Sequence, residues 1–212
     1  MKKLICFAAI IIIVGSCSKS SISPIESVSI GNQIWMLKNL DVSAYRNGEL
    51  IPEVTDMTLW VGLTTGAWCW YNNDSATYAA TYGKLYNWYA VNDSRGLAPS
   101  GWHVPSDVEW RTLSESLRGD TIAGGAMKEA GISHWISPNT GATNSSGFTA
   151  LPGGCRDNRG EFSFITNDGY WWSSSDSDAT DAWSVYLGFY GDLIGRYATT
   201  KIIGYSVRCL RN

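Results

Sequence analysis

The chain has 212 residues and a formal net charge of −3, with 16 Lys and Arg against 19 Asp and Glu. No polybasic segment supplies the phosphate-binding charge on which nucleic-acid-binding proteins depend, so we expect no nucleic-acid partner. Eleven Trp, eleven Tyr and 22 Gly accompany only 17% charged residues. This composition provides apolar area for one core and glycine for many turns, and it predicts one folded domain.

The N-terminus has the pattern of an export signal. Lys2 and Lys3 precede an uncharged apolar run over residues 4–14, which is typical of the first two regions of a signal peptide. The run is well short of the roughly 20 residues that a helix needs to cross a bilayer. Val14-Gly15-Ser16-Cys17 follows and resembles a bacterial lipobox. We therefore predict a signal peptide at 1–16 and lipidation of Cys17; the alternative is an ordinary secretory signal with Cys17 there by chance.

A lipid on Cys17 would make the membrane the first partner of this protein. Two or three acyl chains hold a protein on a bilayer almost irreversibly. Residues 18–24 are small and polar, so residues 17–24 are interpreted as a lipidated, flexible tether before a domain at 25–212. The predicted location is the cell envelope. Ser18 after the cysteine favours the outer membrane, and the sequence does not decide which of its two leaflets would carry the protein.

Two short elements are expected first. Residues 28–36 alternate apolar and polar side chains on both sides of Gly31-Asn32, which predicts a hairpin of two strands. In residues 82–91, Leu85, Trp88 and Tyr89 have the i, i+3, i+4 spacing of one buried helical face and predict a short helix.

The strongest helix signal lies at residues 107–118. Ser106 and Glu109 have the spacing of a capping box, and Gly119 supplies a left-handed end. A shorter helix is expected at 123–130, ending at Gly131. The two glycines near its start each weaken it by about 1 kcal/mol relative to alanine.

The second half of the chain has the pattern of strands and loops. Residues 131–160 are rich in Gly, Asn, Ser and Pro, and strand-like runs follow at 170–175, 182–189, 193–199 and 205–210. Gly191-Asp192 is expected to turn between the middle two runs. The order of hairpin, helices and antiparallel strands predicts an α+β fold.

Seven segments in order resemble the Fibrobacter succinogenes major paralogous domain, which occurs on many bacterial secreted and surface lipoproteins. They are residues 30–36, 65–74, 83–91, 99–110, 147–154, 170–174 and 204–209. Residues 104–110 and 204–209 are also similar to proteins with the C-type lectin-like fold, including the formylglycine-generating, sulfatase-modifying enzymes. The resemblance implies short helices packed on antiparallel strands, a last strand that returns beside the first, and long central loops as the binding face.

Three cysteines, Cys69, Cys155 and Cys209, would follow the lipidated one in an oxidising compartment. The sequence alone allows one disulfide and one free thiol, or none. The resemblance implies that Cys209 has lost its usual partner, because Ala98 stands where many family members carry a cysteine. Cys69 is then the candidate partner of Cys209.

Catalytic chemistry has little support in the sequence. Residues 152–156, Pro-Gly-Gly-Cys-Arg, superficially resemble the cysteine region of the sulfatase-modifying enzymes. No second cysteine or histidine stands nearby to lower the pKa of the Cys155 thiol. We expect Cys155 to be a buried thiol, and we expect no catalytic residue and no cofactor.

A metal site is not expected either. His103 and His134 are far apart in the sequence, and no Cys/His pair has zinc spacing. The carboxylates of Asp176, Asp178 and Asp181 are weak calcium candidates, although their spacing is not that of an EF-hand. A solvated polar loop is the preferred interpretation.

The aromatic residues supply the candidates for ligand binding. Trp35, Trp88, Trp102 and Trp110 lie in patterned elements and are expected in the core. Aromatic faces stack on sugar rings while nearby polar groups hold hydroxyls. Neighbours on a strand point to opposite faces, so one ring of an adjacent pair is expected to be exposed. The candidates are Trp68, Trp70, Tyr71, Asn73, Asp74, Tyr170, Trp171 and Trp172.

Together these patterns predict a lipid-anchored, non-catalytic binding or adhesion module that recognises a glycan or an envelope protein through the loops of residues 131–182. Two alternatives stay open. One is a catalytic relative of the sulfatase-modifying enzymes, and the other is a structural envelope component without a small ligand.

Overall fold

The computed structural model describes residues 25–212. The predicted signal peptide, the lipidation of Cys17 and the tether therefore lie outside the described residues. Within residues 25–212, no helix is both long enough and apolar enough to cross a membrane.

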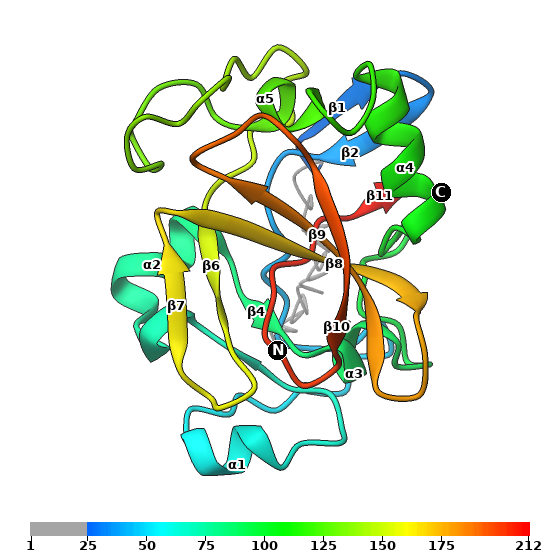
Figure 1. Cartoon of the computed structure of the whole chain (residues 1–212). Coiled ribbons are helices and arrows are strands. Elements are labelled where there is room, and N and C mark those ends of the chain that lie inside the picture. Colours follow the sequence, from blue (N-terminus) through cyan, green and yellow to red (C-terminus); the bar gives the residue numbers. More distant parts are fainter. Residues whose placement is uncertain (1–24) are drawn as a thin grey trace, which may run out of the picture.

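The first sheet joins the two ends of the described chain (Figure 1). Strands β1 (Ser27–Ile30) and β2 (Gln33–Met36) form the predicted hairpin. Gly31 has a φ of 59° in the turn, a conformation that glycine adopts without steric cost. The last strand, β11 (Leu210–Arg211), pairs antiparallel with both β2 and β5 (Trp102–His103), so the order is β1-β2-β11-β5. The C-terminus thus closes onto the opening hairpin.

The second sheet has five strands in the order β10-β9-β8-β6-β7. All its pairs are antiparallel except β6 with β8. The strands predicted near 170–175, 182–189 and 193–199 are confirmed. The bounds are β6 (Gly153–Arg156), β7 (Phe162–Ile165), β8 (Asp168–Asp176), β9 (Asp181–Gly188) and β10 (Gly195–Thr200).

The strand predicted at 205–210 is mostly irregular. Only its last residue belongs to β11, whereas Tyr205 and Ser206 form isolated bridges with Tyr86 and Trp171. This segment passes between the two sheets and bonds to several partners in turn, which prevents one continuous ladder.

The helices are short and lie around the sheets (Figure 1). The predicted capping box is present at α4, where Ser106 and Glu109 satisfy each other's backbone N–H. The helix expected at 123–130 is confirmed in a shorter form. The helical elements are α1 (Met57–Val61), η1 (Tyr71–Asn73, a 3₁₀ turn), α2 (Ser75–Tyr82), α3 (Trp88–Val91), α4 (Asp107–Ser116) and α5 (Ala123–Met127).

The helix predicted over residues 82–91 is wrong in its first half. Leu85 belongs to β4 (Leu85–Tyr86), which pairs with β3 (Trp68–Cys69). The helix begins only at Trp88 because Asn87 caps it by accepting a hydrogen bond from the Ala90 N–H at 3.1 Å. Long-range strand pairing therefore overrides the local helical spacing.

The interior consists of three clusters of buried apolar side chains, all formed within residues 25–212. Trp35, Trp88, Trp102 and Trp110 are all buried, as predicted. Each fully buried large apolar side chain contributes about 1.5–3 kcal/mol. Together the three clusters form the interior against which the sheets and helices of the α+β fold pack.

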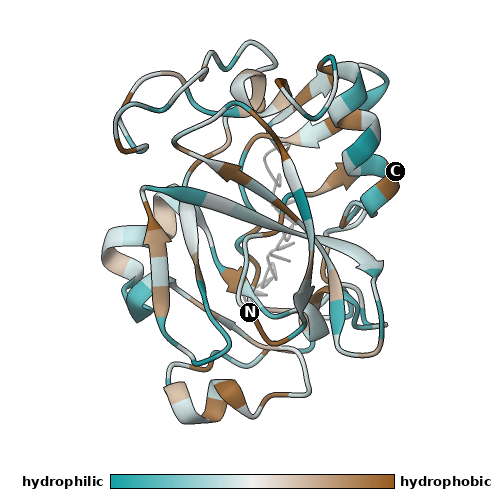
Figure 2. Ribbon diagram, viewed as in Figure 1, coloured by the Kyte–Doolittle hydropathy of each residue, from teal (hydrophilic) through white to brown (hydrophobic). Residues whose placement is uncertain are grey.

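Some apolar side chains stay at the surface. In Figure 2 the short helix α1 carries hydrophobic residues although it projects from the body of the molecule. Trp60 of this helix is buried, whereas Leu59 is 66% exposed.

Candidate functional site

The aromatic residues of the first predicted ligand-binding group lie mostly in the protein interior. Trp68 and Tyr71 are buried, and Trp70 is half-buried against the same core. The ammonium of Lys84 lies 4.3 Å and 4.1 Å from the ring centroids of Trp68 and Trp70 and forms a 2.6 Å ion pair with Asp41. These two rings therefore hold a buried lysine through cation–π contacts.

The polar residues of the same group also have structural partners. The Asn73 side chain donates to the Thr55 carbonyl at 3.1 Å. The Asp74 carboxylate accepts from the Thr77 N–H at 3.1 Å and caps α2. Hydrogen bonds to Thr77 lower the pKa of Asp74, as expected for an N-cap carboxylate.

The expectation that one ring of the Trp171–Trp172 pair is exposed is wrong, because both are fully buried. The two rings point to opposite faces of β8, but each face is covered by a different cluster. Of the second predicted group only Tyr170 is half-buried and reaches a partly open surface.

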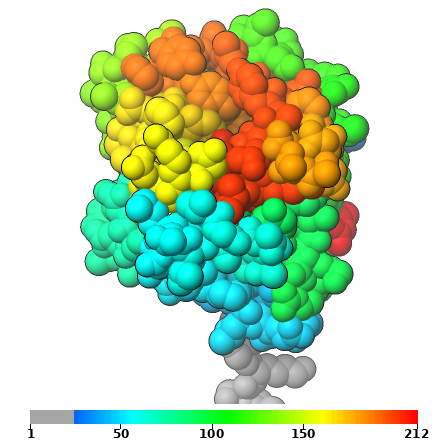
Figure 3. Space-filling view, turned by 60° about the horizontal axis from the view of Figure 1, so that its bottom comes forward, coloured from blue at the N-terminus to red at the C-terminus, as the bar shows by residue number. Residues whose placement is uncertain are grey.

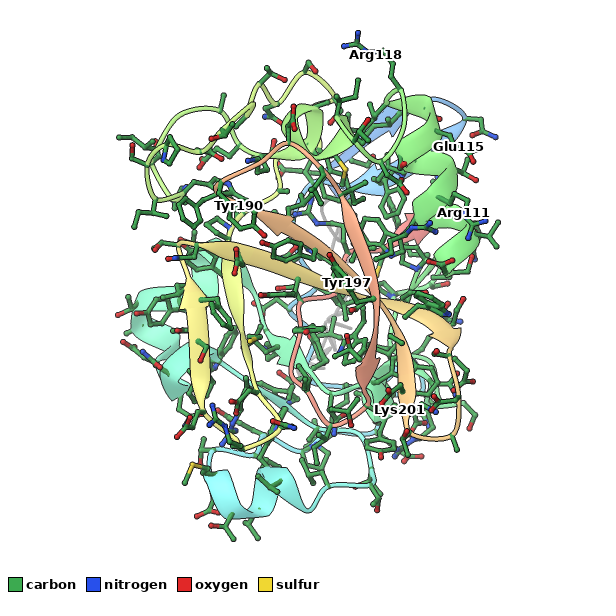
Figure 4. The ribbon with its side chains drawn as sticks, in the orientation of Figure 1. Arg111, Glu115, Arg118, Tyr190, Tyr197 and Lys201 are labelled. Carbon is green, nitrogen blue, oxygen red and sulfur yellow. The ribbon has the colours of Figure 1, made fainter. Side chains whose placement is uncertain are left out.

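That surface is a row of aromatic rings across the second sheet, which we call the tyrosine face. Tyr170 of β8 lies directly opposite Tyr186 of β9, and the ring centroids are 5.3 Å apart. The exposed fractions of the outer members are 53% for Phe164, 60% for Tyr190 and 56% for Tyr197. Figure 4 shows Tyr190 in the β9–β10 connection and Tyr197 on β10. The tyrosine face comprises Phe164, Tyr170, Tyr186, Tyr190 and Tyr197.

The rings form a continuous chain of contacts. Phe164 lies 6.2 Å from Tyr170, and Tyr186 lies 6.3 Å from Tyr197. Tyr170 also stacks on the buried Tyr205, with centroids 4.8 Å apart and planes inclined by 6°. Stacking on an interior ring fixes the orientation of Tyr170. In Figure 3 the yellow surface near residue 160 and the orange-red surface near residues 195–205 border a hollow on this side of the molecule.

Two glycines make room for the rings. Gly195 is the cross-strand partner of Tyr186, and a Cβ there would come within 2.6 Å of Tyr197 Cε2 and 3.1 Å of Tyr186 Cδ1. A Cβ at Gly188 would meet the Tyr186 hydroxyl and lie 3.0 Å from Tyr190 Cε1. The rings thus occupy the space that side chains at these positions would fill.

A carboxylate lies among the rings. The Tyr170 hydroxyl donates to Asp168 Oδ2 at 3.2 Å, and the Tyr186 hydroxyl lies 3.3 Å from Asp168 Oδ1. A 2.7 Å hydrogen bond links the hydroxyls of Tyr186 and Tyr190. Burial raises the pKa of Asp168, and the two tyrosines only partly offset this. The site therefore combines flat apolar rings with a small hydrogen-bonding centre.

Sequence reasoning found Tyr170 but missed Phe164, Tyr186, Tyr190 and Tyr197, together with Asp168. One signal for Tyr186 was present in the sequence. It lies in the strand predicted at 182–189, where alternation places it on the same face as Ser184. The pairing that brings Tyr186 opposite Gly195 is a long-range register, which neither strand encodes by itself.

The three cysteines of the described segment are free and buried. The expected Cys69–Cys209 disulfide is therefore wrong. Cys69 packs in the small cluster with Trp60 and Leu85, whereas Cys209 lies in the large cluster around Trp88. Burial raises the pKa of each of the three thiols to about 12, which opposes formation of a nucleophilic thiolate at Cys155.

Two of the three weak calcium candidates, Asp176 and Asp178, have structural partners. Asp176 pairs with Lys201 at 2.7 Å. Asp178 accepts hydrogen bonds from the backbone N–H groups of Thr180 and Asp181, which orders the β8–β9 connection as a turn. Across residues 25–212 no group of three or more His, Cys, Asp or Glu side chains is placed to hold a metal ion.

The sequence matches one family model, that of the Fibrobacter succinogenes major domain, over residues 28–211. No curated protein and no solved structure matches the chain. The matched region contains both sheets, the three core clusters and the tyrosine face. The chain belongs to the Fibrobacter succinogenes major domain family.

Proposed function

We propose that this protein is a lipid-anchored module of the bacterial cell envelope that binds a glycan through its tyrosine face. The anchor is supported by the signal-peptide pattern of residues 1–16 and the lipobox ending at Cys17. The C-type lectin-like fold is proposed with it. The return of β11 beside the opening hairpin and the short helices around antiparallel strands support that fold.

The tyrosine face carries the proposal. Three of its rings are more than half exposed, although large aromatic side chains bury most of their area in ordinary cores. An aromatic ring complements the apolar face of a pyranose, while hydroxyl and carboxylate groups bind sugar hydroxyls. Tyr170, Tyr186 and Asp168 provide both kinds of group within one hydrogen-bonded cluster.

The rings are also positioned before a ligand arrives. Tyr170 is stacked on Tyr205, and Tyr186 is held by its hydroxyl contacts. Binding to such a surface orders few side chains, and this lowers the entropy cost of association.

A non-catalytic role is part of the proposal. The Cys155 thiol, which the sulfatase-modifying resemblance suggested as a nucleophile, is buried in β6 with a raised pKa. If residues 25–212 oxidised a cysteine-containing peptide with oxygen uptake, and Cys155→Ser abolished this, the catalytic alternative would replace the proposal.

A glycan array tests the binding function with residues 25–212. We expect selective binding to a small set of glycans, lost in Tyr197→Ala because an exposed stacking ring is removed. Val108→Ala is the matched control, since Val108 is 66% exposed on another element. The glycan assignment would be overturned if the wild-type protein bound no glycan on the array, or if Tyr197→Ala bound the same glycans as strongly as wild type.

The anchor needs a separate test in the full chain. Metabolic labelling with a fatty acid should mark the wild-type protein and not Cys17→Ala, because the cysteine thiol is the acceptor. Protease treatment of intact cells then distinguishes a surface-facing from a periplasm-facing domain. Equal labelling of the two proteins would contradict lipidation at Cys17.

A further inference from the structure

A second hollow, of about 370 Å³, lies apart from the tyrosine face beside the start of the described chain. Its lining includes Glu26 and Lys38 from the two sides of the opening hairpin, Ala80 and Thr81 from α2, and the buried Arg208. A hollow of this size lies within the range of pockets that hold small molecules.

Arg208 is 1% exposed, and three of its hydrogen bonds go to backbone oxygens. Its Nη1 donates to the carbonyls of Met36, Leu37 and Phe148 at 3.0, 2.8 and 2.9 Å. Its Nε donates to Asn39 Oδ1 at 3.0 Å. Within residues 25–212, Nη2 has no hydrogen-bond partner and no carboxylate pairs with the guanidinium.

A buried cation without a counter-charge is unfavourable, because desolvation is not offset by a nearby anion. Burial accordingly lowers the pKa of Arg208 to about 9. Dipoles of the carbonyl groups compensate part of this cost. Arg208 lines the hollow. Its Nη2 group is therefore the part of the guanidinium that is left to donate hydrogen bonds to a ligand in that space.

Two other arginines show what is unusual about Arg208. Arg156 is equally buried, but its three nitrogens each donate to a carbonyl oxygen. Arg196 borders another hollow beside α4, but Asp107 and Asp120 neutralise it at 3.2 and 3.6 Å. Only Arg208 of these three combines burial, the lack of a carboxylate and an unused nitrogen.

The remaining lining also fits a small anion. Lys38 adds a second positive charge, and its ion pair with Glu26 is long at 3.8 Å and solvent-exposed. His134 lines the hollow too, and its Nδ1 contacts the Glu129 carboxylate at 2.9 Å. Thr81 contributes a hydroxyl group. The single carboxylate of the lining, Glu26, is therefore opposed by two basic side chains.

We infer that this hollow, which we call the Arg208 pocket, binds a small oxyanion, with a phosphate group accepting the free Nη2 hydrogens of Arg208. Guanidinium groups suit this role because they are planar, weakly hydrated and matched to phosphate geometry. The phosphate has two sources, a soluble molecule or the headgroup of an anionic phospholipid. The second source is reasonable because Glu26 stands at the start of the folded segment, next to the proposed membrane tether.

The test titrates residues 25–212 with inorganic phosphate and follows backbone amide NMR shifts, using chloride at equal ionic strength as reference. We expect saturable shifts around Arg208 and Thr81. Ala80→Trp should fill the exposed mouth of the pocket and weaken phosphate binding by at least about tenfold. Ala76→Trp, one turn earlier on the same exposed helix and outside the lining, is the control and should bind phosphate like wild type.

Arg208→Lys provides a second variant that keeps the charge but lacks the planar fork, and it should also lose phosphate binding while its spectrum stays that of a folded protein. Sedimentation with phosphatidylglycerol or phosphatidylcholine vesicles identifies the source. Selective pelleting with phosphatidylglycerol, reduced by Ala80→Trp, assigns the headgroup; phosphate binding without pelleting assigns a soluble anion.

Absence of saturable phosphate shifts together with absence of selective pelleting would overturn the inference. Phosphate binding that Ala80→Trp leaves unchanged would also overturn it. Glycan binding at the tyrosine face is expected to be unaffected by Ala80→Trp, so the two proposals can fail independently.

Discussion

Two groups of aromatic side chains have opposite surroundings in this protein. Around Trp68 and Trp70, the rings enclose the ammonium of Lys84 and join the core. In the tyrosine face, the rings lie beside Gly188 and Gly195, where no side chain covers them. Adjacent aromatic and polar residues thus do not by themselves identify a binding surface. The neighbours across the sheet decide whether the rings are enclosed or displayed.

The β8 strand contains both situations within a few residues. Tyr170 reaches the surface, whereas Trp171 and Trp172 are fully enclosed. Strand alternation correctly sends the two tryptophans to opposite faces, but each face is packed against its own cluster. One of the two tryptophans could be exposed only if one face of β8 were open to solvent, and at these two positions both faces are covered.

The largest expected effect is the loss of an enclosed ring. Trp171→Ala should lower the free energy of unfolding by about 3–5 kcal/mol, because it leaves a large cavity and removes a ring from the core. Denaturant unfolding of residues 25–212 measures this change. A loss of less than about 1 kcal/mol would show that Trp171 is not enclosed as described and would weaken the contrast with Tyr170.

A smaller effect is expected from filling the space between the displayed rings. Gly195→Val would push its side chain against Tyr197 and Tyr186 and should cost about 1–3 kcal/mol in unfolding free energy. The displaced rings should also bind glycan less tightly. Gly191→Val, in the β9–β10 connection just before this strand, is a matched control, since no atom lies within 4 Å of a Cβ there. Equal glycan affinity in Gly195→Val and wild type would show that ring placement is unimportant.

The smallest effect concerns Asp168, whose pKa is raised by burial. In the folded state this carboxyl holds its proton more tightly than in the unfolded state, so its contribution to stability falls as pH rises from the ordinary value of 3.8 through the raised pKa. Asp168→Asn removes that titration. The stability of wild type relative to Asp168→Asn should therefore decrease with rising pH in denaturant titrations, and a relative increase would contradict the assigned direction.

Local sequence signals predicted the parts of the fold that local interactions determine. The hairpin around Gly31 and the capping box of Ser106 and Glu109 were recognisable because a few neighbouring residues fix them. The helix expected around Leu85 failed because β4 pairs with β3 and with the segment at Tyr205. Those partners lie far away in the sequence and leave no local trace.

The candidate site was predictable only in part for the same reason. Tyr170 was identified, and Tyr186 and Tyr197 fall within strands that were also identified. Their common surface depends on the register that pairs Tyr186 with Tyr170 on one side and Gly195 on the other. The cysteines give a parallel case, since the assignment of Cys69 and Cys209 to different clusters follows from tertiary packing alone.

The most direct test compares one ring from each aromatic group in the same titration. A glycan identified on the array would be titrated calorimetrically into wild type, Tyr186→Ala and Trp70→Ala, with circular dichroism to verify folding. The tyrosine face predicts that Tyr186→Ala weakens binding at least about tenfold, or roughly 1.4 kcal/mol, while Trp70→Ala stays within about twofold of wild type. Loss of binding in Trp70→Ala with unchanged affinity in Tyr186→Ala would contradict the assignment of the site.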